Sequence, residues 1–218
     1  VDARDFDDAV SLEPLADGAV LLGVHIADVS HFVRARTALD REALRRGTSV
    51  YLADRAIPML PERLASQLCT LVPDEDRLTV SVLIHVDAKG QIGDFEVVES
   101  VIRSAARLTY EEVQAVFDGP GSGRAADLGQ LLLAMRDLSR KLKANRLQRG
   151  ALDFDLPEAR VELDAEGLPT ALGQYPRLQS HQLIEEFMLA ANGCVGRLAR
   201  DHQLPVLYRV HRHPDQEK

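Results

Sequence analysis

Four aspartates lie within the first eight residues of the chain: Asp2, Asp5, Asp7 and Asp8. Carboxylates this close together repel one another, which raises their proton affinity and costs stability. A bound divalent cation removes that penalty, and hard oxygen ligands of this kind suit Mg²⁺ or Mn²⁺ better than zinc. Because Mg²⁺ keeps positions open for phosphate oxygens, such a cluster indicates phosphate chemistry.

A second interpretation stays open, because an acidic cluster at a chain start is commonly solvated or caps a helix. The order of the residues favours the metal site. If Phe6 faces a core, Asp5 and Asp7 share the opposite face of an extended segment. Asp8 then turns toward the apolar side, where an unpaired carboxylate is costly.

The elements that must position these aspartates are predicted from apolar periodicity and turn residues. Strands are expected at 9–15 and 20–26, joined by a turn at 16–18, and at 77–87 and 95–102, joined by a turn at 87–90. Long helices are expected at 124–148 and 181–201. Shorter predicted elements are helices at 37–46, 61–68 and 109–118, an extended segment at 55–60, a hairpin at 161–163 and 169–172, and a strand at 205–210.

Antiparallel strand pairs combined with long helices predict an α+β fold whose sheet is mixed and largely antiparallel. The glycine-rich segment 119–123 is expected to be a surface loop within one domain. A chain of 218 residues with 45% apolar residues can build one sizeable core.

Composition narrows the function classes. No run approaches the roughly 20 apolar residues that span a membrane, and the start of the chain does not look like a signal peptide. We therefore expect a cytoplasmic protein with Cys69 and Cys194 as buried free thiols. The net charge of −8 argues against a simple RNA-binding module, but a nuclease built on carboxylates can be acidic overall.

The order of several motifs resembles the ribonuclease II / ribonuclease R family of exoribonucleases. Each motif alone is a weak signal, and their colinearity along nearly the whole chain is a strong one. The matching stretches are Asp2–Ala9, Gly23–His31, Ser49–Leu52, Ile57–Pro61, Glu99–Ser104, Leu108–Glu111, Arg149–Phe154, Leu183–Met188 and Tyr208–His211.

The resemblance implies a Mg²⁺-dependent 3′→5′ exoribonuclease that hydrolyses single-stranded RNA processively to nucleoside 5′-monophosphates. Two parts of the family pattern fall outside the chain: an aspartate three residues before Asp2, and an arginine-rich motif after Lys218. We therefore expect residues 1–218 to be a single partial catalytic domain and to be monomeric. The family's cold-shock and S1 RNA-binding domains are expected elsewhere in the full-length protein and not in these residues.

The resemblance also assigns residues to roles. It implies that Asp5, Asp7 and Asp8 bind two Mg²⁺ ions and activate water, with Asp7 the first choice for chemistry, while Asp2 is more distant. It implies that Tyr51 and Phe154 stack on RNA bases, although a packed core tyrosine is the alternative for Tyr51.

Glu185 and Glu186 fall on either side of the apolar stripe of the predicted helix 181–201. One is expected to face the site and the other solvent, and the family spacing favours Glu186 as the RNA contact. Two solvated carboxylates are the alternative.

Two further groups carry weaker signals. The stretch from His25 to His31 has spacings that resemble metal ligands, but we expect structural hydrogen bonding at the mouth of the site. The basic residues of the first long helix are expected to be a solvated face or a wall of the RNA channel; they are Arg136, Arg140, Lys141, Lys143, Arg146 and Arg149.

Two rival functions remain at this stage. One is a catalytically silent domain of the same fold that binds RNA or a protein, and the other is an unrelated Mg²⁺ phosphatase or phosphotransferase. Metal titration separates the first from the exonuclease. A covalent aspartyl-phosphate intermediate would distinguish the phosphatase or phosphotransferase from a hydrolytic exonuclease.

Overall fold

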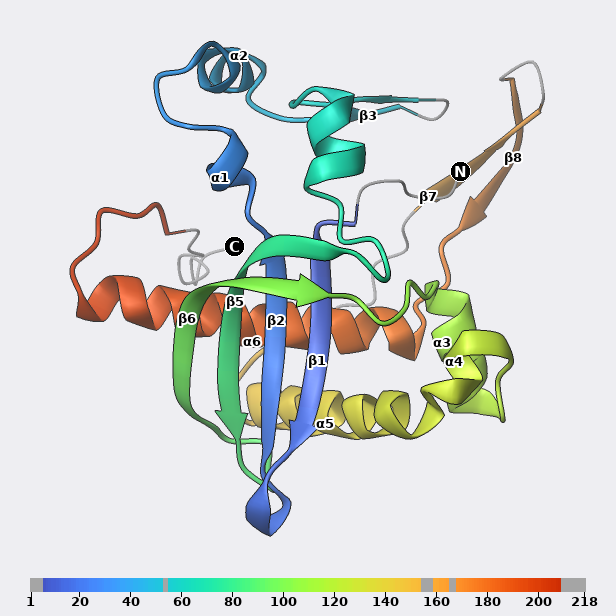
Figure 1. The fold of residues 1–218 in the computed structure, drawn as a ribbon. Helices are drawn as coiled ribbons and strands as arrows, with labels where there is room; N and C mark the ends of the chain where they lie inside the picture. The colour runs from blue at the N-terminus through green and yellow to red at the C-terminus, as the bar shows by residue number, and fades with distance from the viewer. Residues whose placement is uncertain (1–5, 53–54, 154–158, 165–167, 209–218) are drawn as a thin grey trace, which may run out of the picture.

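A computed structural model describes residues 6–52, 55–153, 159–164 and 168–208. Its centre is a four-stranded antiparallel sheet with the strand order β1-β2-β5-β6 (Figure 1). The strands are β1 (Asp8–Pro14), β2 (Val20–Ala27), β5 (Asp76–Val86) and β6 (Ile92–Arg103). β1 and β2 are joined through a short 3-10 turn, η1 (Ala16–Gly18).

Two long helices, α5 (Gly129–Gln148) and α6 (Gln179–Asp201), lie behind the sheet (Figure 1). α6 contacts β2, β5 and β6, and α5 packs on α6. The short helices α3 (Tyr110–Asp118) and α4 (Gly123–Asp127) lie at one end of this pair. The result is a sheet with one face covered by helices, as expected for an α+β fold.

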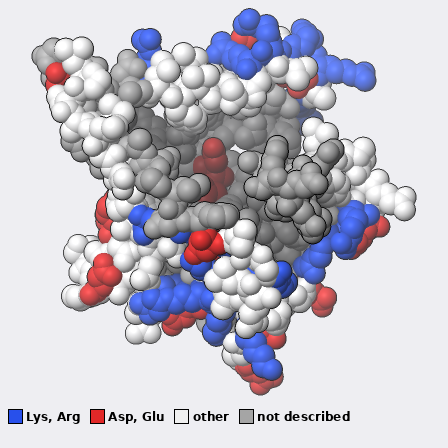
Figure 2. Space-filling model, turned by 180° about the vertical axis from the view of Figure 1, so that it is seen from behind, with Lys and Arg blue, Asp and Glu red and all other residues white. Residues whose placement is uncertain are grey.

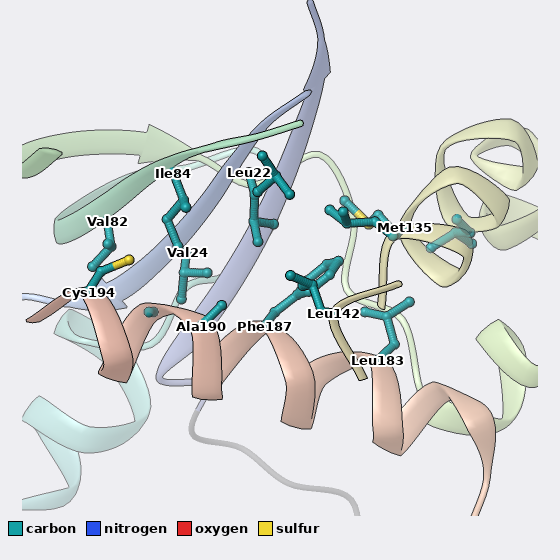
Figure 3. Packing of buried hydrophobic residues seen from close by; sticks show 14 of the residues in the cluster. Leu22, Val24, Val82, Ile84, Met135, Leu142, Leu183, Phe187, Ala190 and Cys194 are labelled. Atoms are coloured by element: carbon teal, nitrogen blue, oxygen red, sulfur yellow. The ribbon is translucent and has the colours of Figure 1, made fainter. Parts of the chain in front are cut away.

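The main core lies between the sheet and α6. Alternate residues of β2 and β5, such as Leu22, Val24 and Ile84, project from one face because strand side chains alternate. They meet Phe187 and Cys194 of α6, which are fully buried (Figure 3).

A smaller lobe stands over the end of the sheet where β2 finishes (Figure 1). It consists of α1 (Val29–Phe32), α2 (Ala38–Arg46), the hairpin of β3 (Val50–Tyr51) and β4 (Ala56–Ile57), and a π-helix, η2 (Leu64–Leu68). A second buried cluster of Ala27, Leu64, Cys69 and Leu71 joins it to the sheet. A separate hairpin, β7 (Ala159–Leu163) and β8 (Pro169–Gln174), extends from the body.

The predicted α+β fold and its largely antiparallel sheet are confirmed. Thr109 forms the expected capping box with Glu112 at the start of α3, and both cysteines are buried and free. None of the helices in the described ranges is both long and apolar enough to cross a bilayer.

Two predicted elements are wrong. The expected helix 124–148 is broken into α4 and α5 at Leu128 and Gly129, where glycine weakens helix continuity because its backbone is the most free. The predicted strand 205–210 is not a strand over residues 205–208, the part that the structure describes. Pro205 lacks an amide donor for a ladder, and Leu207 is fully exposed.

Phe187 is expected to be a major source of stability, because its ring is 0% exposed between α6 and the sheet. Replacing it with alanine should lower the free energy of unfolding by about 3–5 kcal/mol. Urea unfolding followed by circular dichroism measures this. Leu189→Ala, on an exposed part of the same helix, should cost far less, and equal losses would contradict the assignment.

Candidate active site

The backbone before β1 is held from two sides. The amide of Phe6 donates to Thr70 Oγ1 at 2.9 Å, and its carbonyl accepts from the amide of Leu71 at 2.8 Å. The carbonyl of Asp7 accepts from the amide of Ala27, at the end of β2, at 2.9 Å. The backbone that carries Asp7 and Asp8 is therefore fixed where β1 and β2 meet the smaller lobe.

Negative charge collects at this place. Burial raises the pKa of the Cys69 thiol, and the charges of Asp7 and Asp28 raise it further. Burial also raises the pKa of Asp8. Such a concentration of partly enclosed carboxylates is an environment that a cation would stabilise.

A cavity of about 590 Å³ opens beside β1 and reaches Asp8. Its walls come from β1, the segment after β6, and helices α3, α5 and α6. Most of the lining is apolar, but Ser180 has a buried hydroxyl without a hydrogen-bond partner in the described residues. The cavity can therefore take an apolar group that carries a polar atom.

Tyr110 lies on the wall of this cavity and was missed as a site residue by the sequence analysis. Burial raises the pKa of its phenol, and the negative charge of Asp8 adds to the effect. Its ring packs on that of His181 with the centroids 4.1 Å apart. The sequence signal for Tyr110 was its place in the Leu108–Glu111 motif, which also contains the cap of α3.

The segment after β6 also reaches the acidic end of β1. The guanidinium carbon of Arg107 lies 4.5 Å from the centroid of the Phe6 ring, a distance at which a cation and an aromatic face attract. Phe6 is half-buried, while Asp7 is exposed.

The predicted metal ligands are only partly described. Asp7 and Asp8 provide carboxylate oxygens of the type that Mg²⁺ prefers, whereas Asp5 and Asp2 lie outside the described residues. Within those residues no group of three or more metal-binding side chains is found. The donor chemistry fits a hard divalent cation, and the complete ligand set stays a prediction.

Of the two predicted base-stacking residues, only Tyr51 lies in the described part of the chain. Tyr51, on β3, is 71% exposed, so the alternative of a packed core tyrosine is excluded. Phe154 lies outside the described residues. The preceding Asp153 is held by Lys143 at 2.8 Å and Arg177 at 2.6 Å, and these partners lower its pKa to about 2.

Glu186 is 4% exposed and faces α5, where it forms an ion pair with Arg146 at 2.6 Å. Hydrogen bonding to Glu186 raises the pKa of Arg146. Glu185 is the exposed member of the pair. This geometry favours a structural role for Glu186, and RNA contact by its carboxylate stays an untested prediction that the ion pair opposes.

His25 lies in a row of hydrogen bonds that crosses all four strands. Its Nε2 is 3.0 Å from Ser11 Oγ on β1, and its Nδ1 is 2.6 Å from Ser81 Oγ on β5. Ser81 Oγ continues to Ser100 Oγ on β6. Gly23 makes room for the row, because a Cβ there would lie 2.3 Å from Ser11 Oγ. The expected structural hydrogen bonding is therefore confirmed for His25.

The basic face of α5 is largely engaged within the chain. Lys141 donates to the carbonyl of Ala88, Lys143 pairs with Asp153, and Arg146 pairs with Glu186. Arg140 donates to Gln179 on α6. These contacts tie α5 to its neighbours, and a role as a channel wall stays a prediction.

Comparison with known proteins decides the family. The family model described as RNB domain matches residues 1–218. The chain belongs to the RNB domain family. Ribonuclease R of Aquifex aeolicus is 45% identical over 218 residues, covering 99% of this chain and 31% of that protein. DIS3-like exonuclease 2 of Schizosaccharomyces pombe is 39% identical, covering 99% of this chain and 25% of that protein.

Solved structures agree with this RNB assignment. Mycoplasma genitalium RNase R in complex with ribose methylated single-stranded RNA is similar with a TM-score of 0.93 and 29% identity, over 99% of this chain and 34% of that one. Yeast Ssd1, a pseudonuclease, has a TM-score of 0.70 at 20% identity, a likeness of fold alone. This RNB chain spans about a third of the length of the ribonuclease R proteins that it matches.

The stability of the RNB domain should depend on pH through His25. Burial lowers the pKa of this imidazole below its usual value of about 6.5. The unfolded chain then binds a proton more readily than the folded one, so this contribution is constant above about pH 6.5 and is lost as the pH falls. The loss should reach at most about 1.4 kcal/mol per pH unit.

Urea unfolding between pH 7.5 and 5 measures this effect. The difference in unfolding free energy between the native chain and His25→Asn should shrink toward acid pH, since the variant lacks the titrating group. A constant difference would show that the pKa of His25 is the same in the folded and unfolded chains, and a growing difference that it is raised in the fold. Either result would contradict the prediction.

Glu186→Ala should destabilise the RNB domain by roughly 2 kcal/mol or more, because it leaves the guanidinium of Arg146 without its buried partner. Glu185→Ala, at an exposed position, should stay within about 0.5 kcal/mol. Thermal unfolding measures both. If Glu186→Ala keeps native stability but loses RNA affinity, the structural assignment is wrong.

Proposed function

We propose that this chain is the catalytic part of a Mg²⁺-dependent 3′→5′ exoribonuclease that degrades single-stranded RNA processively to nucleoside 5′-monophosphates. Membership of the RNB domain family supports a ribonuclease of this class. The observation that carries the proposal is the position of Asp7 and Asp8. They occupy the fixed end of β1, where charge collects and a cavity opens.

The chain's own residues define what the site can do. Asp5, Asp7 and Asp8 would hold the divalent cation. A bound cation would supply an acidic water and neutralise charge on the phosphate. Since the backbone of Phe6 and Asp7 is hydrogen-bonded on both sides, the carboxylates stay in position without reorganisation.

Substrate selection would come from surfaces that contact bases and sugars. The exposed ring of Tyr51 offers a stacking surface to any base, which suits degradation without sequence preference. Tyr110, beside Asp8, places a hydroxyl within the same cavity as the carboxylate. Both residues recognise features that single strands expose and duplexes hide.

The alternative is a domain of this fold that binds RNA without hydrolysis. Its basis is the likeness to yeast Ssd1, a pseudonuclease, which shows that the fold by itself does not decide catalysis. The two functions differ in whether RNA is cleaved, so one experiment separates them.

The test uses a chain extended at both ends, with 5′-labelled single-stranded RNA and Mg²⁺. The native protein should give a ladder that shortens from the 3′ end and stops on addition of EDTA. Asp7→Asn should reduce the rate at least about a thousandfold, since electrostatic and metal-holding groups contribute on this scale. Its fold should be unchanged because Asp7 contributes its carbonyl, not its carboxylate, to the pairing with Ala27.

Glu13→Gln is the matched control, because it removes an exposed carboxylate from the far end of the same strand and should leave the ladder intact. Bound but uncleaved RNA with the folded native protein would instead favour the binding domain. Internal cuts, or cleavage that survives in Asp7→Asn, would contradict the assigned chemistry.

A further inference from the structure

The smaller lobe carries a charge opposite to that of the whole chain. Residues 34–52 contain five arginines and two acidic residues, a net charge of +3 in a chain whose net charge is −8. Figure 2 shows Lys and Arg gathered at the corner of the molecule where α2 lies in Figure 1. Arginine charge is therefore concentrated on one lobe, which calls for an explanation beyond solubility.

The two acidic residues of this segment do not neutralise its surface. Asp40 accepts the backbone amide of Arg36 at 2.7 Å and so holds the loop before α2. Glu42 is shared by Arg45 and Arg46, both at 2.8 Å. Within the described residues no carboxylate is paired with Arg34, Arg36 or Arg41. The remaining positive charge points into solvent.

The outer side of α2 is arranged as one surface. Arg41 and Arg45 are four residues apart, which places them on the same helix face about 5–6 Å apart at Cβ. Leu44, one turn after Arg41 on the same helix, is 81% exposed. Arg34 and Arg36 are exposed in the preceding loop. We call the surface formed by Arg34, Arg36, Arg41 and Arg45 the α2 basic face.

The α2 basic face is rigidly connected to Tyr51. Arg46 donates from Nη1 to the carbonyl of Pro58 at 3.0 Å, and Ser49 Oγ accepts the amide of Met59 at 2.9 Å. These bonds join the end of α2 to the β3–β4 hairpin, which exposes Tyr51, Val50 and Ile57. Guanidinium groups and an exposed aromatic ring thus stand on one unit.

We propose that the α2 basic face binds the phosphodiester backbone of single-stranded RNA at nucleotides beyond the one that stacks on Tyr51. Guanidinium groups are strong bidentate phosphate ligands. A row of them beside an aromatic ring is the combination that binds single strands without sequence preference. The inference rests on the proposed function for the direction in which the strand runs, and extends it by a second contact surface.

The test measures binding of a fluorescent 20-nucleotide RNA of mixed sequence to the 218-residue chain, with EDTA present to prevent cleavage. The variant is Arg41→Ala/Arg45→Ala. Each lost phosphate contact lowers the slope of log affinity against log salt by about 0.7 for single strands, so the double variant should lose about 1.4. Its affinity near 0.1 M KCl should fall about tenfold or more.

Two controls make the result specific. Arg124→Ala/Arg200→Ala removes two exposed arginines that pair with acidic neighbours elsewhere, and should change neither affinity nor slope. Arg41→Lys/Arg45→Lys keeps both charges and should retain most of the slope. Thermal unfolding of each variant verifies that folding is unchanged. If the alanine variant does not fold, Arg41→Gln/Arg45→Gln, which removes the charges but keeps long polar side chains, takes its place with the same expected loss of slope.

Several outcomes overturn the proposal. Equal affinity and slope in the native chain and the alanine variant would show that RNA does not contact this face. A native chain that forms dimers by light scattering, with dimers lost in the alanine variant while RNA binding is kept, would assign the face to self-association. Salt-dependent binding through the face by a chain that never cleaves RNA would instead sustain this inference and defeat the proposed exonuclease.

Discussion

The pairing of β1 with β2 is the constraint on which the candidate site depends. Asp8 lies opposite Ile26, and the carbonyl of Asp7 extends the ladder to Ala27. Because side chains alternate along a strand, a shift by one residue would turn the side chain of Asp8 to the other face of the sheet. The position of each carboxylate therefore depends on this register, which hydrogen bonds to Thr70 and Leu71 extend beyond the strand.

A polar row inside an apolar sheet protects that register. His25 bonds to Ser11 on one neighbouring strand and to Ser81 on the other, so a slip would leave a buried imidazole without partners. Unpaired buried polar groups cost more than paired ones contribute. Gly23 is needed for the same reason, since any larger residue would separate Ser11 from His25. The row of hydrogen bonds adds little stability to the native register, but its loss makes a shifted register strongly unfavourable.

Acidic and basic side chains lie on different parts of this acidic chain. The carboxylates gather at the end of β1, and Lys141, Lys143 and Arg146 of α5 are paired with groups outside that helix. The α2 basic face is exposed, and within it Arg45 also pairs with Glu42 of the same helix. Paired charges within a helical layer fix how α5 and α6 lie together, while exposed arginines at a rim attract phosphate. A net charge of −8 thus conceals a basic lobe beside an acidic site.

What could be predicted from the sequence was local. Alternating residues in 77–87, and the turn residues before 20–26, predicted these two strands within one residue at either end. Thr109 with Glu112 predicted the start of α3. The order of motifs led to the RNB domain family. These features depend on side-chain alternation, capping and spacing, which neighbouring residues determine by themselves.

The tertiary structure decided the rest. Helical spacing put Glu185 and Glu186 on either side of a stripe, but only the packing of α5 shows that Glu186 meets Arg146. Tyr110 reaches Asp8 because α3 folds back beside β1, across about a hundred residues of chain. Such contacts arise from three-dimensional packing, which periodicity along the chain does not encode.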